Sequence, residues 1–593
     1  MRKEQPGFAP ARFDGLAWYR GIRVKERKNR PYLRLAGIAC GVLAPCLQAW
    51  AQQPDMAAQE LLRQQERERV LREQQESRPD VRLEREGDAD DGRLPVDETP
   101  CFPVRRIVLE GELGDRFQWA LGAADAGDDP ATGRCLGSEG ISRVMRRIQN
   151  AIIARGYVTT RVLAAPQDLK QGLLTLTVVP GRIRAVRFAG EAPPSARWRN
   201  ALPARPGDVL NLRDVEQALE NFQRVPTVTA DIQFVPAEEA GAAPGESDLV
   251  ITWQQYSRLR GQLSLDDGGS QATGKLQAGA TLSVDNPTGW NDLAYVNLGR
   301  SLFNGSGRRT DSWSAHYSIP FGNWLASANA GDYDYRQTVA GAYESYVYSG
   351  GSRNAELRLA RMLFRNANGK TSAYARGWWR ESDNFIDDTE IEVQRRRMAG
   401  WELGISHKHF IGNATLDANL AWRRGTGAFH ALHAPEEAFG EGTARATLVT
   451  ADARLSVPFG LGRQSLRYIA DWRGQWNRTP LVPQDRFAIG GRYTVRGFDG
   501  ESSLSGERGW LLRNELGVSI GGGQEAYLAA DYGHVGGPST QWQMGDRLAG
   551  VAAGLRGGAG WFQWDVFVGS PVLRPAGFPT AYTTYGFNLS GSF

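Results

Sequence analysis

The sequence contains no run of 18 or more apolar residues, which is the length that a transmembrane helix requires. Its mean hydropathy is −0.43 and 23% of its 593 residues are charged, so a helical membrane protein is excluded. Cysteine (4) and methionine (6) are scarce, whereas glycine (70) and aromatic residues (10%) are abundant. This composition is typical of β-rich chains, outer-membrane barrels among them.

A general excess of basic charge is also missing. The formal net charge is +4, but residues 1–51 alone carry ten Lys/Arg and three Asp/Glu, which leaves −3 on the remainder. Because nucleic-acid binding needs a strongly basic surface, we expect no nucleic acid among the partners.

The first 51 residues have the order of a secretion signal. A basic segment (1–34) leads into an apolar run (33–47), and Ala49-Trp50-Ala51 then forms a small-x-small cleavage site before Gln52. We therefore predict a signal peptide over residues 1–51.

Only Cys101 and Cys135 belong to the predicted mature chain. Cys40 and Cys46 fall inside the signal, and neither follows the Leu-small-small triplet of a lipoprotein. In an exported protein a cysteine pair predicts a structural disulfide, because the periplasm is oxidising. The alternative is a redox or metal site, but two cysteines alone cannot close a zinc site, and we expect no metal and no cofactor.

Residues 54–78 consist almost entirely of strong helix formers, with a proline at the start. Too few of them are apolar to form a core stripe, so this helix is either a solvated spacer or housed in a polar cavity. We assign residues 52–78 to an N-terminal plug helix. Residues 79–100 are acidic and contain Pro and Gly without periodicity, so we predict a disordered linker there.

The next part of the chain holds a diverged repeat. Each copy is expected to contain a strand, an amphipathic helix and a closing strand: residues 106–111, 138–155 and 172–179 in the first copy, and 186–190, 212–223 and 248–253 in the second. The pattern predicts two small α+β modules, over residues 101–180 and 181–255. Their exposed sheet edges are natural docking sites for an extended chain.

From residue 256 to residue 593 the pattern is β throughout. About sixteen segments alternate apolar and small polar residues, near 259–266, 274–285, 291–301, 311–319, 324–335, 351–364, 370–382, 396–410, 413–424, 443–457, 464–477, 508–519, 525–533, 548–556, 561–569 and 581–593. Transmembrane barrel strands show this alternation, with apolar side chains outward and polar side chains inward.

The connections between these segments alternate in length. Short ones such as 286–290 and 320–323 alternate with long ones at 336–350, 425–442, 478–507 and 534–547. A barrel with short periplasmic turns and long external loops shows this alternation. We therefore predict a β-dominated fold, a 16-stranded transmembrane barrel preceded by a helix and two periplasmic modules.

The longest external loop carries the sequence Val495-Arg496-Gly497-Phe498. This resembles the VRG[YF] motif in the sixth loop of Omp85-superfamily barrels. With the signal, helix, linker, two modules and sixteen strands, the whole mature chain resembles the TpsB transporters of two-partner secretion, and the modules resemble POTRA domains.

The family's second motif, G-x-D-x-G on the thirteenth strand, is similar to residues 529–533, which read Ala-Ala-Asp-Tyr-Gly. The resemblance implies that the sixth loop folds into the lumen, where Arg496 pairs with Asp531 near Gly533. A carboxylate that holds a guanidinium in a confined polar space is a good latch. We further expect this loop to gain little from apolar burial and to depend on the ion pair.

Two other patterns point elsewhere. Residues 517–521 satisfy G-x-S-x-G, but a nucleophile elbow needs a strand–turn–helix, whereas this stretch ends a strand and leads into a glycine turn. His407 and His409 share one strand face without a nearby acidic or cysteine cluster, which disfavours a metal site. No catalytic constellation is present, so we expect no enzyme.

The resemblance implies an outer-membrane pore that recognises an unfolded large TpsA-type exoprotein in the periplasm and translocates it to the cell surface. Its other partners would be outer-membrane lipid and, during biogenesis, the barrel-assembly machinery, with the transporter itself a monomer. An Omp85-type insertase that folds other barrels is the alternative, and two modules with an N-terminal helix favour the pore. An adhesin or passive porin would leave the modules without a role.

Overall fold

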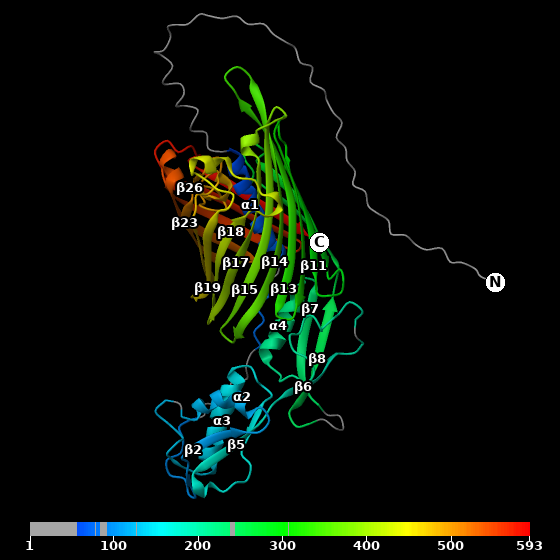
Figure 1. Ribbon diagram of the computed structural model, residues 1–593, viewed down its shortest axis with the longest axis vertical. Coiled ribbons are helices and arrows are strands. Elements are labelled where there is room, and N and C mark those ends of the chain that lie inside the picture. The colour runs from blue at the N-terminus through cyan, green and yellow to red at the C-terminus, as the bar shows by residue number, and fades with distance from the viewer. Residues whose placement is uncertain are drawn as a thin grey trace, which may run out of the picture. The chain divides into compact units, whose positions relative to one another are not determined.

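The computed structural model describes residues 56–76, 79–83, 92–125, 127–191, 193–237, 243–305 and 307–593. The signal peptide predicted over residues 1–51 lies outside these ranges. In order along the chain, the described part comprises helix α1 (Met56–Gln75), two α+β modules and a large barrel (Figure 1). Among the described residues, no helix is both long enough and apolar enough to cross a membrane.

Each module is a three-stranded sheet packed against one long helix. In module 1, strands β2 (Arg106–Glu110), β5 (Leu173–Val179) and β4 (Arg161–Leu163) lie in that order beside α3 (Ser138–Ala154). In module 2 the order is β6 (Arg182–Phe188), β8 (Glu246–Gln255) and β7 (Val228–Pro236), with α4 (Leu212–Gln223). Strands β2 and β5 pair in parallel in module 1, and β6 and β8 do so in module 2, which the helix that connects them along the chain permits.

The sequence pattern missed one strand of each three-stranded sheet, and in module 1 also the two-residue strands β1 (Phe102–Pro103) and β3 (Cys135–Leu136), which pair with each other. Strand β4 has three residues, too few for a period of two to be visible. Strand β7 places Val228, Ala230, Ile232 and Phe234 on one face, and this alternation in the sequence was sufficient to predict a strand. Each module therefore runs strand, helix, strand, strand.

The end of the predicted linker is bound to module 1. The Asp129 carboxylate accepts a 2.8 Å hydrogen bond from the Leu94 N–H, and this bond, with the Arg147 guanidinium, lowers the pKa of Asp129 to about 2. The Glu98 carboxylate accepts backbone N–H groups at the start of α3, and Cys101 is bonded to Cys135. Residues 92–101 are therefore an ordered part of this module.

Sixteen long strands close into a barrel within residues 259–592, as the sequence predicts. Neighbouring strands are antiparallel, and the last strand pairs with the first. The strands are β9 (Leu259–Asp266), β10 (Leu276–Asp285), β11 (Leu293–Leu302), β12 (Arg309–Phe321), β13 (Trp324–Ala340), β14 (Ser345–Asn366), β15 (Gly369–Ile386), β17 (Arg396–Ile411), β18 (Ala414–Thr426), β19 (Thr447–Leu461), β20 (Gln464–Asn477), β23 (Arg508–Gly521), β24 (Gln524–Gly536), β25 (Arg547–Ala559), β26 (Phe562–Leu573) and β27 (Thr584–Ser592). The two-residue strand β16 (Thr389–Glu390) pairs only with the end of β15.

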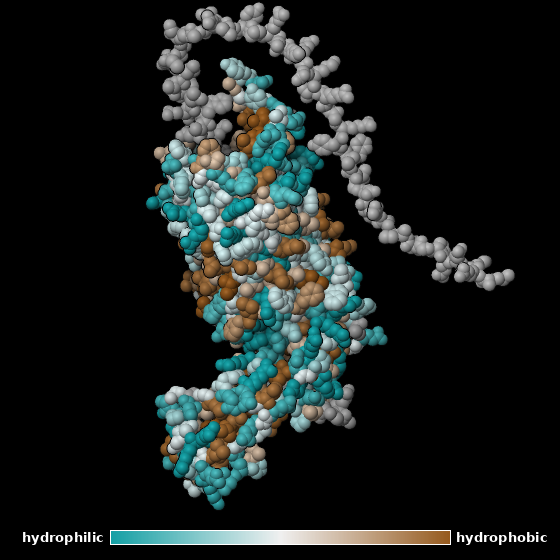
Figure 2. Space-filling view, viewed as in Figure 1, coloured by the Kyte–Doolittle hydropathy of each residue, from teal (hydrophilic) through white to brown (hydrophobic). Residues whose placement is uncertain are grey.

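The outer face of the barrel is apolar. Leu298, Leu357 and Leu528 point outward and are 57–69% exposed. Figure 2 shows a band of hydrophobic side chains across the middle of the barrel, bordered by hydrophilic surface. Because leucine exposed to this extent is unfavourable in water, the band fits a lipid environment.

One predicted connection has a different structure. Residues 336–350 were expected to form a long loop, but β13 continues to Ala340 and β14 starts at Ser345. The two strands stay paired to the tip, and Tyr348 of the extension packs with Tyr333 and Tyr335, which precede the extension on β13. A hairpin can continue beyond the membrane because its backbone groups are satisfied by the partner strand.

We expect the disulfide to stabilise module 1 without affecting the barrel. The bond closes a loop of 34 residues, which the chain-entropy model values at about 3–4 kcal/mol. The double variant Cys101→Ser/Cys135→Ser should therefore be cut by protease within residues 92–136 at a lower temperature than the wild type. Its barrel should keep the wild-type heat-modifiable mobility on gels, and equal protease resistance of the two proteins would contradict the prediction.

Candidate functional site

The loop between β20 and β23, called loop 6 below, folds back against the inner wall of the barrel. It contains a short hairpin, β21 (Phe487–Ile489) paired with β22 (Leu504–Gly506), and the Val495–Phe498 motif lies between these two strands. The hairpin fixes both ends of the motif, so the motif is presented to the wall formed by β23–β26.

Arg496 forms a bidentate ion pair with Asp531 of β24. Its Nε lies 2.7 Å from Asp531 Oδ2 and its Nη2 lies 2.8 Å from Oδ1, and the Arg496 N–H also donates to Oδ2 at 2.9 Å. The Arg496 Nη1 donates to Glu515 of β23 at 2.5 Å. The Arg496 and Asp531 side chains are 8% and 0% exposed, so solvent screens this pair little. The sequence reasoning missed Glu515, which lies on the neighbouring strand and faces inward as Asp531 does.

Glycines on the wall let the motif approach closely. A Cβ on Gly550 of β25 would lie 2.0 Å from the Arg496 carbonyl oxygen, and one on Gly533 would lie 2.9 Å from Val495. Gly497 has φ +94°, a conformation in which other residues are strained. Backbone contacts of this kind admit no side chain, so the glycines determine where loop 6 sits.

Loop 6 also has an apolar anchor, contrary to the expectation that it gains little from burial. Val495 and Phe498 are 0% and 3% exposed. They belong to one cluster, which also contains Ile489, Leu504, Leu511, Val535, Leu548 and Phe578. The residues between the wall and the folded loop exclude water, so apolar burial and the ion pair act together.

Helix α1 lies inside the barrel. Arg67 contacts Asp266 on β9 at 3.2 Å, and Arg72 contacts Glu356 on β14 at 2.7 Å. On another side Glu66 contacts Arg473 of β20 at 2.9 Å. These partners belong to the first, sixth and eleventh of the sixteen strands, so the wall surrounds the helix. The sequence left open whether this helix is a solvated spacer or lies in a polar cavity, and in the structure it lies in a polar cavity.

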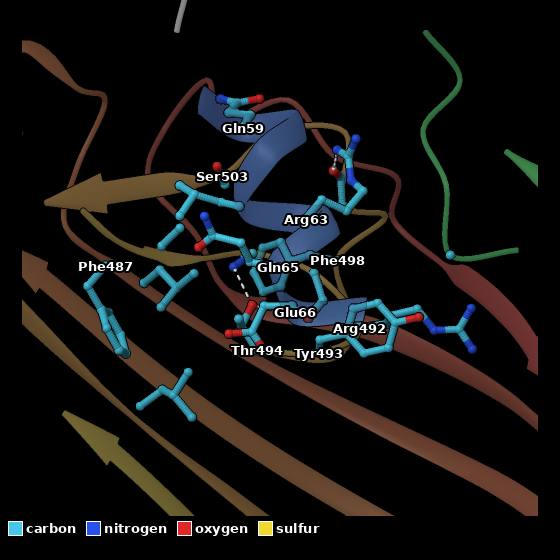
Figure 3. A pocket seen from close by; sticks show the side chains of 18 of the residues that line it. Gln59, Arg63, Gln65, Glu66, Phe487, Arg492, Tyr493, Thr494, Phe498 and Ser503 are labelled. Carbon is cyan, nitrogen blue, oxygen red and sulfur yellow. Dashed lines mark hydrogen bonds between the residues drawn. The ribbon is translucent and has the colours of Figure 1, made fainter. Parts of the chain in front are cut away.

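The helix and loop 6 touch each other. Arg63 donates to the Gly500 carbonyl at 2.6 Å, and Figure 3 shows α1 beside the loop residues Tyr493, Thr494 and Phe498. A cavity of about 540 Å³ remains between α1, loop 6 and the wall. Together the two segments occupy the lumen.

Module 2 is joined to the periplasmic turns of the barrel by buried amide groups. The Asn200 side chain donates to the carbonyls of Trp290 and Pro320, and Asn221 donates to the Gly322 carbonyl. Asn200 and Asn221 are 4% and 5% exposed, and a buried amide is costly to leave unbonded. The contacts fix module 2 at the mouth of the lumen.

The other sequence patterns occupy structural positions. Residues 517–521 form the end of β23 and lead into a glycine turn, as expected. His407 lies on β17 and shares a hydrogen bond with Thr371, and its ring stacks with that of His409.

A closed barrel with an apolar outer band, an occupied polar lumen and modules at its mouth defines a class, the outer-membrane transporters. Comparison with known proteins identifies the family. The family described as haemolysin secretion/activation protein ShlB/FhaC/HecB matches residues 245–557, a ShlB-type POTRA domain matches 102–181 and a further POTRA domain matches 182–236.

Curated relatives and solved structures agree with this match. The outer membrane transporter CdiB-2 of Burkholderia pseudomallei is 38% identical over 84% of this chain and 88% of its own length. The hemolysin transporter protein ShlB of Serratia marcescens is 26% identical over 73% of this chain and 76% of its own. The solved structure of CdiB from Acinetobacter baumannii has 30% identity and a TM-score of 0.81, and covers 91% of this chain and 100% of its own.

The chain therefore belongs to the ShlB/FhaC/HecB family, the TpsB branch of the Omp85 superfamily. It is an outer-membrane, two-partner secretion transporter whose POTRA modules lie in the periplasm. Members of this family are transporters.

The glycine contacts generate a test of how loop 6 is seated. In Gly550→Ala the new Cβ would collide with the Arg496 backbone, so we expect loop 6 to leave the wall and trypsin to cleave after Arg492 or Arg496 at least tenfold faster. The matched control is Gly558→Ala on the same strand, where the nearest atom to the new Cβ lies 3.4 Å away. Similar cleavage rates in the two variants would refute this account of the seating.

Proposed function

We propose that this transporter carries a large, unfolded TpsA-type exoprotein, with α1 as its resting plug and the Arg496–Asp531 pair as the latch of loop 6. The observation that carries the proposal is the filling of the lumen by two segments of the chain itself. An unfolded polypeptide cannot pass while both remain in place. Transport therefore requires α1 to leave and loop 6 to rearrange.

The two obstacles are held by contacts of different strength. The ion pairs that join α1 to the barrel wall are partly exposed, with side chains that are 13–36% accessible, so solvent screens them more than the pair of loop 6. The Arg496–Asp531 pair is almost fully buried and has an apolar cluster beside it. The plug is thus the more easily displaced of the two.

The exoprotein would first bind the periplasmic modules. Strands β2 and β4 form the edges of the module 1 sheet, and β6 and β7 form those of module 2. An extended cargo segment can add to such an edge through backbone hydrogen bonds. Because the periplasm holds no ATP, folding of the cargo outside the cell would then give the transport its direction.

The remaining partners follow from this role. The apolar outer band would contact outer-membrane lipid, the barrel-assembly machinery would insert the barrel, and a closed barrel with its own lumen would work as a monomer. An insertase for other barrels is the alternative function, and the family membership favours secretion over it.

Deletion of residues 56–75 should raise ion conductance in planar bilayers severalfold, because it empties part of the lumen. Glu73→Gln is the control, since Glu73 forms an ion pair with Arg69 of the same helix. Unchanged conductance in the deletion variant would show that α1 does not plug the pore.

Arg496→Ala should reduce export of the exoprotein at least tenfold while the barrel still assembles. The lost charge-assisted hydrogen bonds contribute roughly 1.5–3 kcal/mol each to the seating of the loop. Arg496→Lys should rescue poorly, because an ammonium group cannot reproduce the bidentate geometry.

The partner residue provides the control for this prediction. Asp531→Ala should behave like Arg496→Ala, and the double variant should be no worse than either single variant. Strictly additive export defects, or normal export by Arg496→Ala, would exclude the latch.

A further inference from the structure

Five residues of the predicted linker, 79–83, form an extended segment bound between module 2 and the barrel mouth. The segment begins four residues after the end of α1. It was predicted to be disordered, yet its backbone and side chains make specific contacts with both α4 and the barrel.

Two carboxylates of α4 bind the backbone of this segment. Glu220 Oε1 accepts the Val81 N–H at 3.1 Å, and Glu216 Oε1 accepts the Leu83 N–H at 3.1 Å. The two glutamates are one helical turn apart, and the two N–H groups are two residues apart along an extended chain. This spacing suits an extended backbone, in which alternate N–H groups point the same way.

Cations of the barrel bind the carbonyls of the same segment. Arg365, at the end of β14, donates to the Val81 carbonyl at 2.5 Å and to Glu220 at 2.9 Å. Lys370 of β15 donates to the Pro79 carbonyl at 3.3 Å. The Glu216 side chain is 0% exposed and that of Arg365 is 7% exposed, so both are buried beneath the segment.

The side chains of the segment add selectivity. Val81 and Leu83 pack against the apolar core of module 2. Asp80 forms ion pairs with Lys370 at 2.8 Å and with Lys408 of β17 at 2.6 Å. The site thus accepts an extended peptide with two apolar side chains at alternate positions and an acidic residue directly before the first.

We propose that this site, formed by Glu216, Glu220, Arg365, Lys370 and Lys408, binds an extended segment of the cargo with that chemistry, which displaces residues 79–83 from it. The proposal rests on the proposed secretion function. It makes cargo binding at the lumen mouth and release of the plug the same event, because only residues 76–78 separate α1 from the displaced segment.

The geometry of the chain permits this exchange. Module 1 holds residues 92–101, and the sixteen residues 76–91 lie between α1 and that part of the chain. Sixteen extended residues span about 50 Å. The helix α1 has 20 residues and is therefore about 30 Å long, so it can leave the lumen while module 1 retains its linker.

The first test measures peptide binding and requires no transport. The probe is a labelled peptide with the sequence of residues 78–85, and the receptor is the full chain with residues 79–83 replaced by Gly-Ser-Gly-Ser-Gly. We expect the peptide to bind this receptor at least tenfold more tightly than the wild type, whose tethered segment competes at a high effective concentration.

Backbone methylation of the peptide tests the recognition itself. N-methylation at the Val81 position removes the donor to Glu220 and should weaken binding at least tenfold. N-methylation at Arg82, whose N–H makes none of the described contacts with the site, is the matched control and should change binding less than threefold. Equal effects of the two methyl groups, or no binding to the opened receptor, would overturn the site.

The second test asks whether the cargo uses the site. One variant changes the linker residues, and another changes lysines of the site that contact them. The Gly-Ser linker variant and the double variant Lys370→Gln/Lys408→Gln both weaken the binding of the linker segment to the site, so both should raise conductance. The linker variant should export the exoprotein at the wild-type level, whereas the lysine variant should export at least fivefold less. Arg463→Gln, in the periplasmic turn between β19 and β20, is the control for lost positive charge.

Equal export by the linker and lysine variants, whether high or low, would mean that the site serves the linker alone and would overturn the proposal. Absence of export by the wild type would instead refute the secretion function, and the peptide measurements would still decide whether the site exists.

Discussion

Closure of the strand ring is the constraint on which the rest of the structure depends. In lipid every backbone N–H and C=O must be bonded within the protein, and pairing of β27 with β9 leaves no open edge among the sixteen strands. The alternation that turns leucines outward also turns Glu356, Asp266 and Asp531 inward. A lumen lined in this way is polar, and a segment that fills it must be polar too.

The two segments that fill the lumen meet this requirement differently. Helix α1 has charged residues on all sides and finds counter-charges on opposite walls, so it needs little apolar contact. Loop 6 excludes water locally, and this makes the Arg496–Asp531 pair strong and gives Val495 and Phe498 an apolar environment. A pore with one weakly held and one strongly held obstruction can open in steps.

Module 2 connects these obstructions to the periplasm. Its amides hold the barrel turns, and its helix α4 holds the linker that leads to the plug. Module 1 holds the other end of that linker through Asp129, Glu98 and the Cys101–Cys135 bond. An event at the modules is thus linked to the lumen by covalent chain, without any need for a change in barrel shape.

The sequence by itself determined the sixteen strands, because a period of two is a local property that each strand shows alone. It also gave the helical character of residues 56–75, and the motif resemblance pointed to Arg496 and Asp531 as partners. Only the tertiary structure revealed Glu515, the clearance at Gly550 and the bound state of residues 79–83. Val81 lies 284 positions from Arg365, and the pattern of a few linker residues contains no information about partners that only the closed barrel brings near.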